Sequence, residues 1–407
     1  MAYYRLQVDS CPSYWVKSFI STDSFRMRKL TPRFANWLRH RQRSVQRQLR
    51  RARRRHEMVE IVSVSGVFQT KASSKAQKMP SVLSFEENGP ETLAALADVR
   101  RGLAMPLGGS RNTNKYSKHR NARPRWMGRY SNFEAIEKIT PGAALVLAAE
   151  FSRPLHLSGA PGQVINAHKW RPEVLETLWD IGFFDIVGLP QNLAKPDMHA
   201  PIVVVPMKTG HMADGAAVTD LINSLRALYP GTVGEVSEAN MTRLYGAMIE
   251  GIVNVVRHAY PEGASYPYRP TRHWFMTGAV DRSRGWTTAV IYDQGITIPL
   301  TLPNWQNYRG YARRIAARLG LVPHPNDPKS DGYAIAAAVE ESVSSTGEAH
   351  RGQGLAQMRD FVNQCRDGYL RLMSRQGEVV FRNGRPPEIK THDVSIGGTL
   401  IEWGALL

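Results

Sequence analysis

Met248-Ile-Glu-Gly-Ile-Val-Asn-Val-Val-Arg-His-Ala-Tyr260 is the stretch that says most about this 407-residue chain. Its apolar residues recur at helical spacing, so we expect a helix with Glu250, Asn254 and His258 at i, i+4 and i+8 on one face. A carboxylate there can take a proton from an attacking water or hydroxyl group, and an amide oxygen can hold Mg²⁺ on phosphates. His258 is the better candidate for capping the helix end. Alone, Glu and Asn on a helix are usually solvated, so the hypothesis needs support from elsewhere in the sequence.

Three further motifs follow in order. A β-branched and aromatic strand, Trp286 to Tyr292, ends in Asp293-Gln-Gly295. Gly352-Gln-Gly354 opens an apolar-periodic helix, where glycine backbone and free N–H groups suit phosphates, although a Gly-x-Gly pair by itself is a weak signal. A last strand, Ile396 to Trp403, contains Gly397-Gly-Thr399.

This ordered series resembles the GHKL ATPase family, and most closely its histidine-kinase and anti-sigma branch. The resemblance covers residues 201–407 and implies a Bergerat-type ATP-binding α/β sandwich that takes ATP and Mg²⁺. It implies Glu250 as the catalytic residue, Asn254 as the metal ligand, and Leu300 to Arg351 as a lid. The other nucleotide-binding residues that the resemblance implies are Asp293, Gly295, Gly352, Gly354 and Thr399.

The chemistry of the implied adenine contact can be stated from the residues. A buried carboxylate at Asp293 would accept a hydrogen from the adenine amino group, and guanine offers an acceptor at that position instead. Gly295 would let the backbone approach the base, and Thr399 would offer a hydroxyl on the pocket floor. The sequence departs from the family pattern at Thr297, where a second glycine usually stands.

The preceding segment, residues 76–200, predicts a small α/β layer because strand-like and helical stretches alternate. Ile139-Thr-Pro-Gly-Ala-Ala-Leu-Val-Leu-Ala-Ala149 with the later Leu178-x3-Gly-Phe-Phe184 resembles STAS-like domains. That resemblance implies a phosphate acceptor beside the helix start, with Ser131 and Thr140 as candidates. A docking or dimer scaffold is the alternative.

Residues 1–75 predict a basic helical arm. The chain has a net charge of +18, and Arg26 to Arg55 holds 13 Lys or Arg and no acid. Arginine favours bidentate contact with phosphate, and a helix this basic repels itself unless anions neutralise it. Binding to a nucleic-acid backbone, docking on an acidic protein partner, and a merely solvated arm all remain open.

Composition narrows the class of protein. Apolar residues make up 42% of the sequence, which is typical of globular cores, and no apolar run reaches the length of a membrane helix. Cys11 and Cys365 are too few and too far apart for a disulfide framework or a metal site. With no signal-peptide pattern at the N-terminus, we expect a cytoplasmic protein with no membrane contact.

Three functional hypotheses follow. The first is an ATP- and Mg-binding regulatory protein whose slow ATP hydrolysis or phosphotransfer switches the basic N-terminal half. A homodimer is an open alternative to a monomer for this protein. The second is a serine/threonine protein kinase of the anti-sigma type. The third is a nucleic-acid-binding module whose ATP site is vestigial.

Overall fold

The structure is a computed structural model that describes residues 32–56, 59–64, 67–70, 76–103, 125–127, 130–159, 161–162, 164–190, 193–197, 200–229, 238–304, 310, 313, 316–317, 327–344 and 354–407. The chain divides into two compact units, Met1–Glu57 and Met58–Leu407. In the first unit, helix α1 (Pro32–His56) confirms the basic helix that the sequence predicts.

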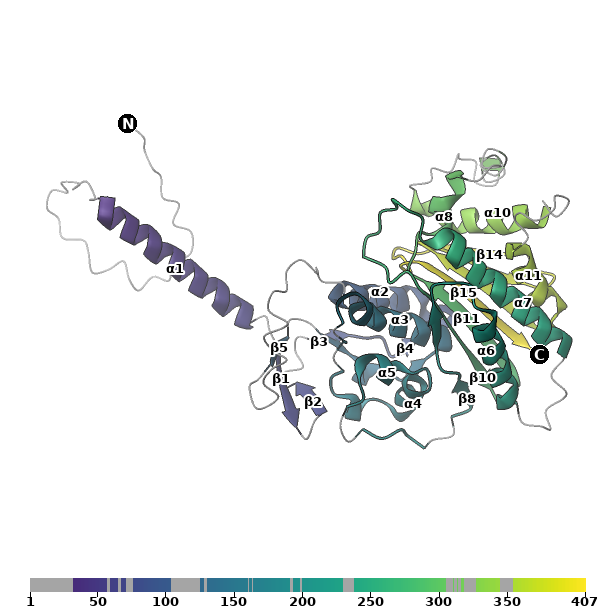
Figure 1. Cartoon of the computed structure of the whole chain (residues 1–407), viewed down its shortest axis with the longest axis horizontal. Coiled ribbons are helices and arrows are strands. Elements are labelled where there is room, and N and C mark those ends of the chain that lie inside the picture. The colour runs from purple at the N-terminus through teal and green to yellow at the C-terminus, as the bar shows by residue number, and fades with distance from the viewer. Residues whose placement is uncertain are drawn as a thin grey trace. The chain divides into compact units, whose positions relative to one another are not determined.

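The second unit is built on one large antiparallel sheet (Figure 1). Its strand order is β14-β13-β12-β15-β11-β10-β8, and β9 also pairs with β10. The strands are β8 (Ile202–Val204), β9 (Lys208–Gly210), β10 (Trp274–Asp281), β11 (Trp286–Asp293), β12 (Gly368–Ser374), β13 (Gly377–Arg382), β14 (Glu388–Thr391) and β15 (Thr399–Leu406).

Helices cover what we call the front face of this sheet. Because successive strand residues point to opposite faces, Ile291 and its odd-numbered neighbours on β11 face these helices. Ile291, Ile401 and Trp403 share one apolar core with the buried residues of the front-face helices. These helices are α6 (Gly215–Leu228), α7 (Glu238–Asn254), the π-helix η4 (Val255–Ala259), α10 (Asp331–Ser344) and α11 (Gly354–Gln364).

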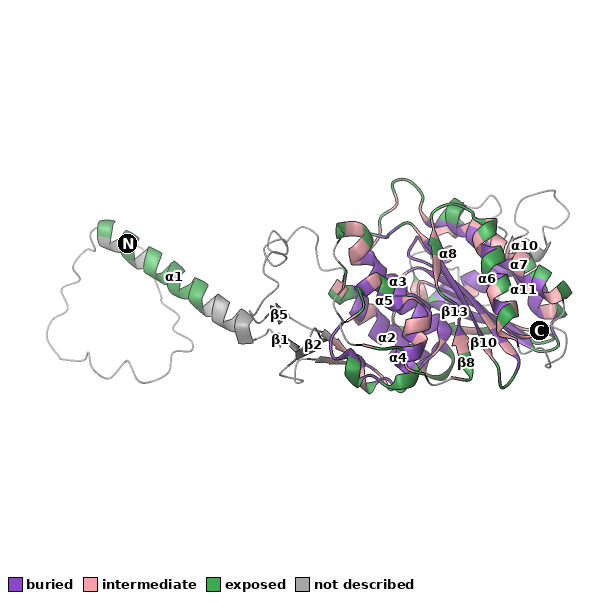
Figure 2. Ribbon diagram, turned by 60° about the horizontal axis from the view of Figure 1, so that its bottom comes forward, coloured by how far each residue is buried: buried purple, intermediate pink, exposed green. Residues whose placement is uncertain are grey.

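A second helical layer covers the back face, and α3 is its most buried member. Val290, Tyr292 and Leu400 point into this layer and share a core with it, so both faces of the central strands are buried (Figure 2). The back layer consists of α2 (Phe85–Leu103), α3 (Pro141–Ser158), α4 (Pro172–Asp180) and α5 (Phe183–Val187).

The remaining elements are short. Strands β3 and β6, and likewise β4 and β7, form two-stranded parallel pairs, while β1, β2 and β5 form a separate antiparallel sheet. Their bounds are β1 (Val59–Val64), β2 (Val67–Thr70), β3 (Ala76–Lys78), β4 (Val82–Leu83), β5 (Arg125–Met127), β6 (Tyr130–Asn132) and β7 (Lys138–Ile139). Short helical turns are η2 (Phe133–Ala135), η3 (Ala167–Lys169), α8 (Ile298–Thr301), η5 (Leu302–Asn304) and η6 (Pro328–Ser330).

The prediction of a mixed α/β protein is confirmed. We expected residues 76–200 and 201–407 to be separate domains; in the structure both belong to the unit Met58–Leu407, because α2 and α3 bury their apolar residues on the back of the sheet. Whether either segment folds independently stays a prediction. Within the described part of the chain, no helix has the length and apolar character needed to cross a membrane.

Candidate functional site

Helix α7 lies close against the front face of the sheet. Met248 and Ile252 are buried in the front core, which follows from their helical spacing. Gly251 permits the close approach, since a Cβ there would stand 2.7 Å from Cδ1 of Ile291 and 3.5 Å from Cη2 of Trp403. The helix is therefore held at a fixed distance from the sheet, and its side chains one turn apart have defined positions.

Glu250 and Asn254 meet the start of α11. A Cβ built on Gly354 would stand 2.7 Å from Oε2 of Glu250 and 3.2 Å from Nδ2 of Asn254. The amide nitrogen of Asn254 is buried and has no hydrogen-bond partner in the described part of the chain. Buried polar groups are nearly always paired, so this atom marks a place where a ligand acceptor fits. The predicted partner Gly352 lies outside the described residues.

His258 was expected on the same face, and it lies beyond the end of the α-helical part of this segment. The α-helical hydrogen bonding ends at Asn254, and residues Val255–Ala259 form a π-helix. A π-helix has a wider turn than an α-helix, so the angular spacing between Glu250 and His258 differs from that of a regular helix. His258 is exposed, and its pKa is lowered, first by partial burial of the ring and then by Arg257.

Asp293 ends β11 as a buried carboxylate without a cation among the described residues. Burial raises its pKa to about 7, although the backbone N–H groups of Gly295 and Thr399 partly oppose the shift. Gly295 N donates to Asp293 Oδ1 at 2.7 Å. Such a carboxylate keeps acceptor capacity for a ligand that carries a hydrogen-bond donor.

Asp293, Thr399 and Ser374 form a row across three neighbouring strands. Asp293 is directly opposite Thr399, and Thr399 is directly opposite Ser374. By strand alternation all three point to the front face, the side on which α7 and α11 lie. The hydroxyls of Ser374 and Thr399 are 2.9 Å apart, and Ile298 N donates to Ser374 Oγ at 2.9 Å. The row forms a polar floor.

Two glycines and Thr297 shape this floor. Gly398 must lack a side chain, because a Cβ would stand 1.8 Å from the carbonyl oxygen of Asp293. A Cβ on Gly295 would stand 2.3 Å from the carbonyl oxygen of Ala259, at the end of η4. Thr297 occupies the position before α8, and its buried hydroxyl has no partner among the described residues.

Buried polar groups of the back layer hold the strand end that carries Asp293. Tyr292 Oη donates to Glu150 Oε1 at 3.0 Å, and Gln294 Nε2 donates to the carbonyl oxygen of Ala149 at 2.9 Å. Arg100 Nε donates to Glu150 at 2.9 Å, and its guanidinium also donates to the carbonyl oxygen of Ile396. Although burial raises the pKa of Glu150, Arg100 and Arg153 outweigh it and lower that pKa.

The candidate residues form two groups on the front side of the sheet: Glu250, Asn254 and Gly354 where α7 meets α11, and Asp293 and Thr399 on the strands. The segment after α7 is hydrogen-bonded to the segment after Asp293, because the carbonyl oxygen of Ala259 accepts from Ile296 N at 2.7 Å. The sequence did not indicate Ser374, since a lone serine after a strand carries no signal. Arg100 and Glu150 were missed because their pairing spans 50 residues.

Comparison with known proteins identifies no relative: no family model, no curated protein and no solved structure matches the chain. No cluster of three or more His, Cys, Asp or Glu side chains that could hold a metal occurs among the described residues.

Proposed function

We propose that the protein is an ATP- and Mg-binding regulatory protein of the GHKL type, with a Bergerat-type site between α7, α11 and the sheet. The observation that carries the proposal is a pair of buried polar groups on the front face. Asn254 Nδ2 is buried without a partner, and Asp293 is buried without a cation in the described part of the chain. A ligand with acceptors at one end and an amino donor at the other would satisfy both.

The residues present fit a magnesium nucleotide. Asn254 would hold the ion through its amide oxygen, and Gly354 leaves room for a phosphate because a side chain would displace Glu250. Magnesium neutralises phosphate charge when bound. Asp293 would accept the adenine amino hydrogen, and the N–H groups at the start of α11 would face the phosphates. Glu250 would take the proton from an attacking water or protein hydroxyl.

The test is Mg-dependent ATP and ADP binding by calorimetry on wild type and Asn254→Ala. We expect binding that requires magnesium and falls at least tenfold in the variant, or about 1.4 kcal/mol. Asn240→Ala is the matched control, because Asn240 lies on the same helix but at its other end, where its Oδ1 accepts from Arg243 at 3.0 Å. No binding by folded wild type would refute the proposal.

Phosphotransfer to a protein hydroxyl is the kinase version of the same proposal. Among the residues 76–200, Thr140 precedes α3, and its hydroxyl donates to the carbonyl oxygen of Leu83 at 3.3 Å. Label from γ-labelled ATP on Ser or Thr, lost in Glu250→Ala, would support transfer. Release of phosphate without labelled protein would support hydrolysis.

Nucleic-acid binding by α1 is a second candidate function, since its 25 residues include no acid. Arg33, Arg41, Arg43 and Arg47 are exposed, and the guanidinium of Arg41 lies 5.0 Å from the ring centroid of Trp37. Binding to duplex DNA or RNA should weaken steeply with salt and with neutralisation of these arginines. An acidic protein partner is the alternative ligand, and failure to bind duplex DNA or RNA at low salt would favour it.

A further inference from the structure

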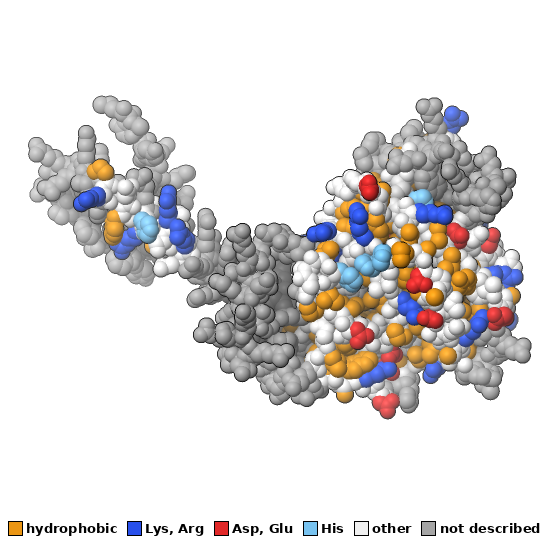
Figure 3. Space-filling model, viewed as in Figure 1, with side chains coloured by type: hydrophobic (Ala, Val, Ile, Leu, Met, Phe, Trp, Pro, Cys, Tyr) orange, Lys and Arg blue, Asp and Glu red, His pale blue; other side chains and the backbone are white. Residues whose placement is uncertain are grey.

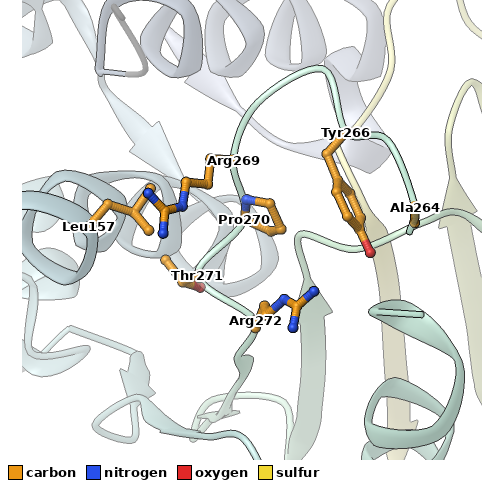
Figure 4. Close-up of a pocket in the computed structure, with 7 residues that line it drawn as sticks. All are labelled: Leu157, Ala264, Tyr266, Arg269, Pro270, Thr271 and Arg272. Atoms are coloured by element: carbon orange, nitrogen blue, oxygen red, sulfur yellow. The ribbon is translucent and has the colours of Figure 1, made fainter. Parts of the chain in front are cut away.

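A cavity of about 530 Å³ opens between the C-terminal end of α3 and the loop that follows η4. This volume lies within the range of small-molecule sites. The cavity is lined by Leu157, Ala264, Tyr266, Arg269, Pro270, Thr271 and Arg272 (Figure 4). None of these residues takes part in the site described above.

The cavity presents two guanidinium groups. Arg269 and Arg272 are exposed, and both line the cavity. Figure 4 shows Arg269 on the side of Leu157, and Arg272 on the other side of Pro270, below Tyr266. Arginine forks donate in pairs to phosphate oxygens, so guanidinium groups that line one cavity favour a ligand with a phosphate.

The wall between the arginines is held in place. Thr271 donates to Gln294 Oε1 from its backbone nitrogen at 3.2 Å and from its hydroxyl at 3.3 Å. The carbonyl oxygen of Arg269 accepts from Arg153 at 2.5 Å. The buried Pro270 between them is thereby fixed, and the two arginines project from a short loop with a defined backbone.

Arg272 has a left-handed backbone conformation with φ of 62°. A residue other than glycine is strained in such a conformation, which persists where the surroundings impose it. Arg272 lines the cavity in this conformation, although glycine would have been the unstrained choice there.

The rest of the lining is suited to an apolar body. Leu157 and Pro270 offer aliphatic surface, and Tyr266 offers a ring whose hydroxyl donates to the carbonyl oxygen of Ala259 at 3.3 Å. Residues beside the cavity add imidazoles: the His156 and His273 rings lie 4.8 Å apart, and His211 is 5.9 Å from His273. Figure 3 shows histidine side chains together on one face, with Lys and Arg nearby.

We infer that this cavity is a second ligand site, for a small phosphate monoester that carries a planar apolar body. The arginines would bind the phosphate, and the Tyr266 and Leu157 surfaces would cover the ring. The inference does not rest on the proposed nucleotide site, because none of its residues is shared. The two sites are joined by Gln294, which bonds both Thr271 and helix α3 next to Asp293.

The test uses 1-naphthyl phosphate as the probe, measured by calorimetry on the full chain, with 1-naphthol and inorganic phosphate for comparison. We expect the ester to bind at least tenfold more tightly than either fragment. Arg269→Ala and Arg272→Gly should each weaken binding at least tenfold. Arg272→Gly also relieves the positive φ, so its thermal stability should be equal to or above that of wild type, and loss of binding cannot be attributed to unfolding.

Two controls make the outcome decisive. Arg385→Ala removes the same charge from an exposed turn between β13 and β14, and should leave binding unchanged. Asn254→Ala should leave ester binding unchanged while it weakens Mg-ATP. The inference is overturned if the ester binds no better than its fragments, if both cavity variants bind normally, if Arg385→Ala loses as much as they do, or if Asn254→Ala abolishes ester binding.

Discussion

The guanidinium of Arg100 on α2 lies directly against the backbone of Gly397, where a Cβ would stand only 2.1 Å from Arg100 Cζ. Gly397 leads into the Gly398-Thr399 floor on which Asp293 lies, so a residue of the back layer supports the front-face site from behind. Arg100 cannot move aside easily, because it is buried and bonded to Glu150 and to the carbonyl oxygen of Ile396.

Gly397→Ala should therefore destabilise the protein by about 3 kcal/mol or more. Its φ of 88° costs an alanine about 1 to 2 kcal/mol, and the contact with Arg100 adds an overpacking cost. Gly384→Ala is the matched control, since its φ is 68° but no atom lies within 4 Å of its Cβ position. If urea unfolding shows the same loss of unfolding free energy for both variants, the contact with Arg100 has no role in the cost.

Glu150→Gln should cost about 3 to 5 kcal/mol, because it leaves Arg100 and Arg153 buried without a carboxylate. The control is Glu87→Gln, whose ion pair with Lys138 is half-exposed and worth under about 1 kcal/mol. Thermal unfolding of both variants measures the difference. If both variants lose the same stability, the buried ion pairs of Glu150 contribute no more to the free energy of unfolding than an exposed pair does.

Asp293→Asn should stabilise the ligand-free protein at alkaline pH. The folded-state pKa of about 7 lies above the ordinary value of 3.8, so the folded state binds the proton more tightly. The free energy of unfolding of wild type is then highest at low pH. It falls by a total on the order of 4 kcal/mol as the pH rises from about 4 to 7, and it stays low above pH 7. The difference in melting temperature between Asp293→Asn and wild type should therefore be larger at pH 8 than at pH 5.

ATP binding should show the opposite dependence on pH, if Asp293 accepts the adenine amino hydrogen as an anion. With a pKa of about 7, roughly a tenth of the carboxylate is ionised at pH 6, so affinity should be about tenfold lower there than at pH 8. Asp293→Asn should bind weakly with little dependence on pH. A flat profile for wild type would remove Asp293 from the adenine contact.

Gly354→Ala should weaken Mg-ATP binding at least tenfold without loss of fold. The added Cβ would press on Oε2 of Glu250 at 2.7 Å, while alanine is the better helix former. Gly246→Ala, on α7 with nothing within 4 Å of its Cβ position, should stabilise by up to about 1 kcal/mol and bind normally. Normal ATP affinity in Gly354→Ala would show that the phosphates bind elsewhere.

The local elements of this protein follow from its sequence. The apolar spacing around Glu250 predicts α7, the β-branched run before Asp293 predicts β11, and Pro141 with its apolar successors predicts α3. These patterns are readable because helix and strand periodicities depend on residues close in the chain. The nearness of Glu250 to Asn254 is of the same kind, since one helical turn separates them.

The tertiary structure alone decided where those elements meet. It turned Val255–Ala259 into a π-helix, and it brought Ser374 beside Thr399. It also placed α2 and α3 on the back of the sheet, where Arg100 and Glu150 pair across 50 residues of sequence. Such contacts depend on which apolar faces bury one another, and that competition is settled by the packing of the whole unit rather than by any local pattern.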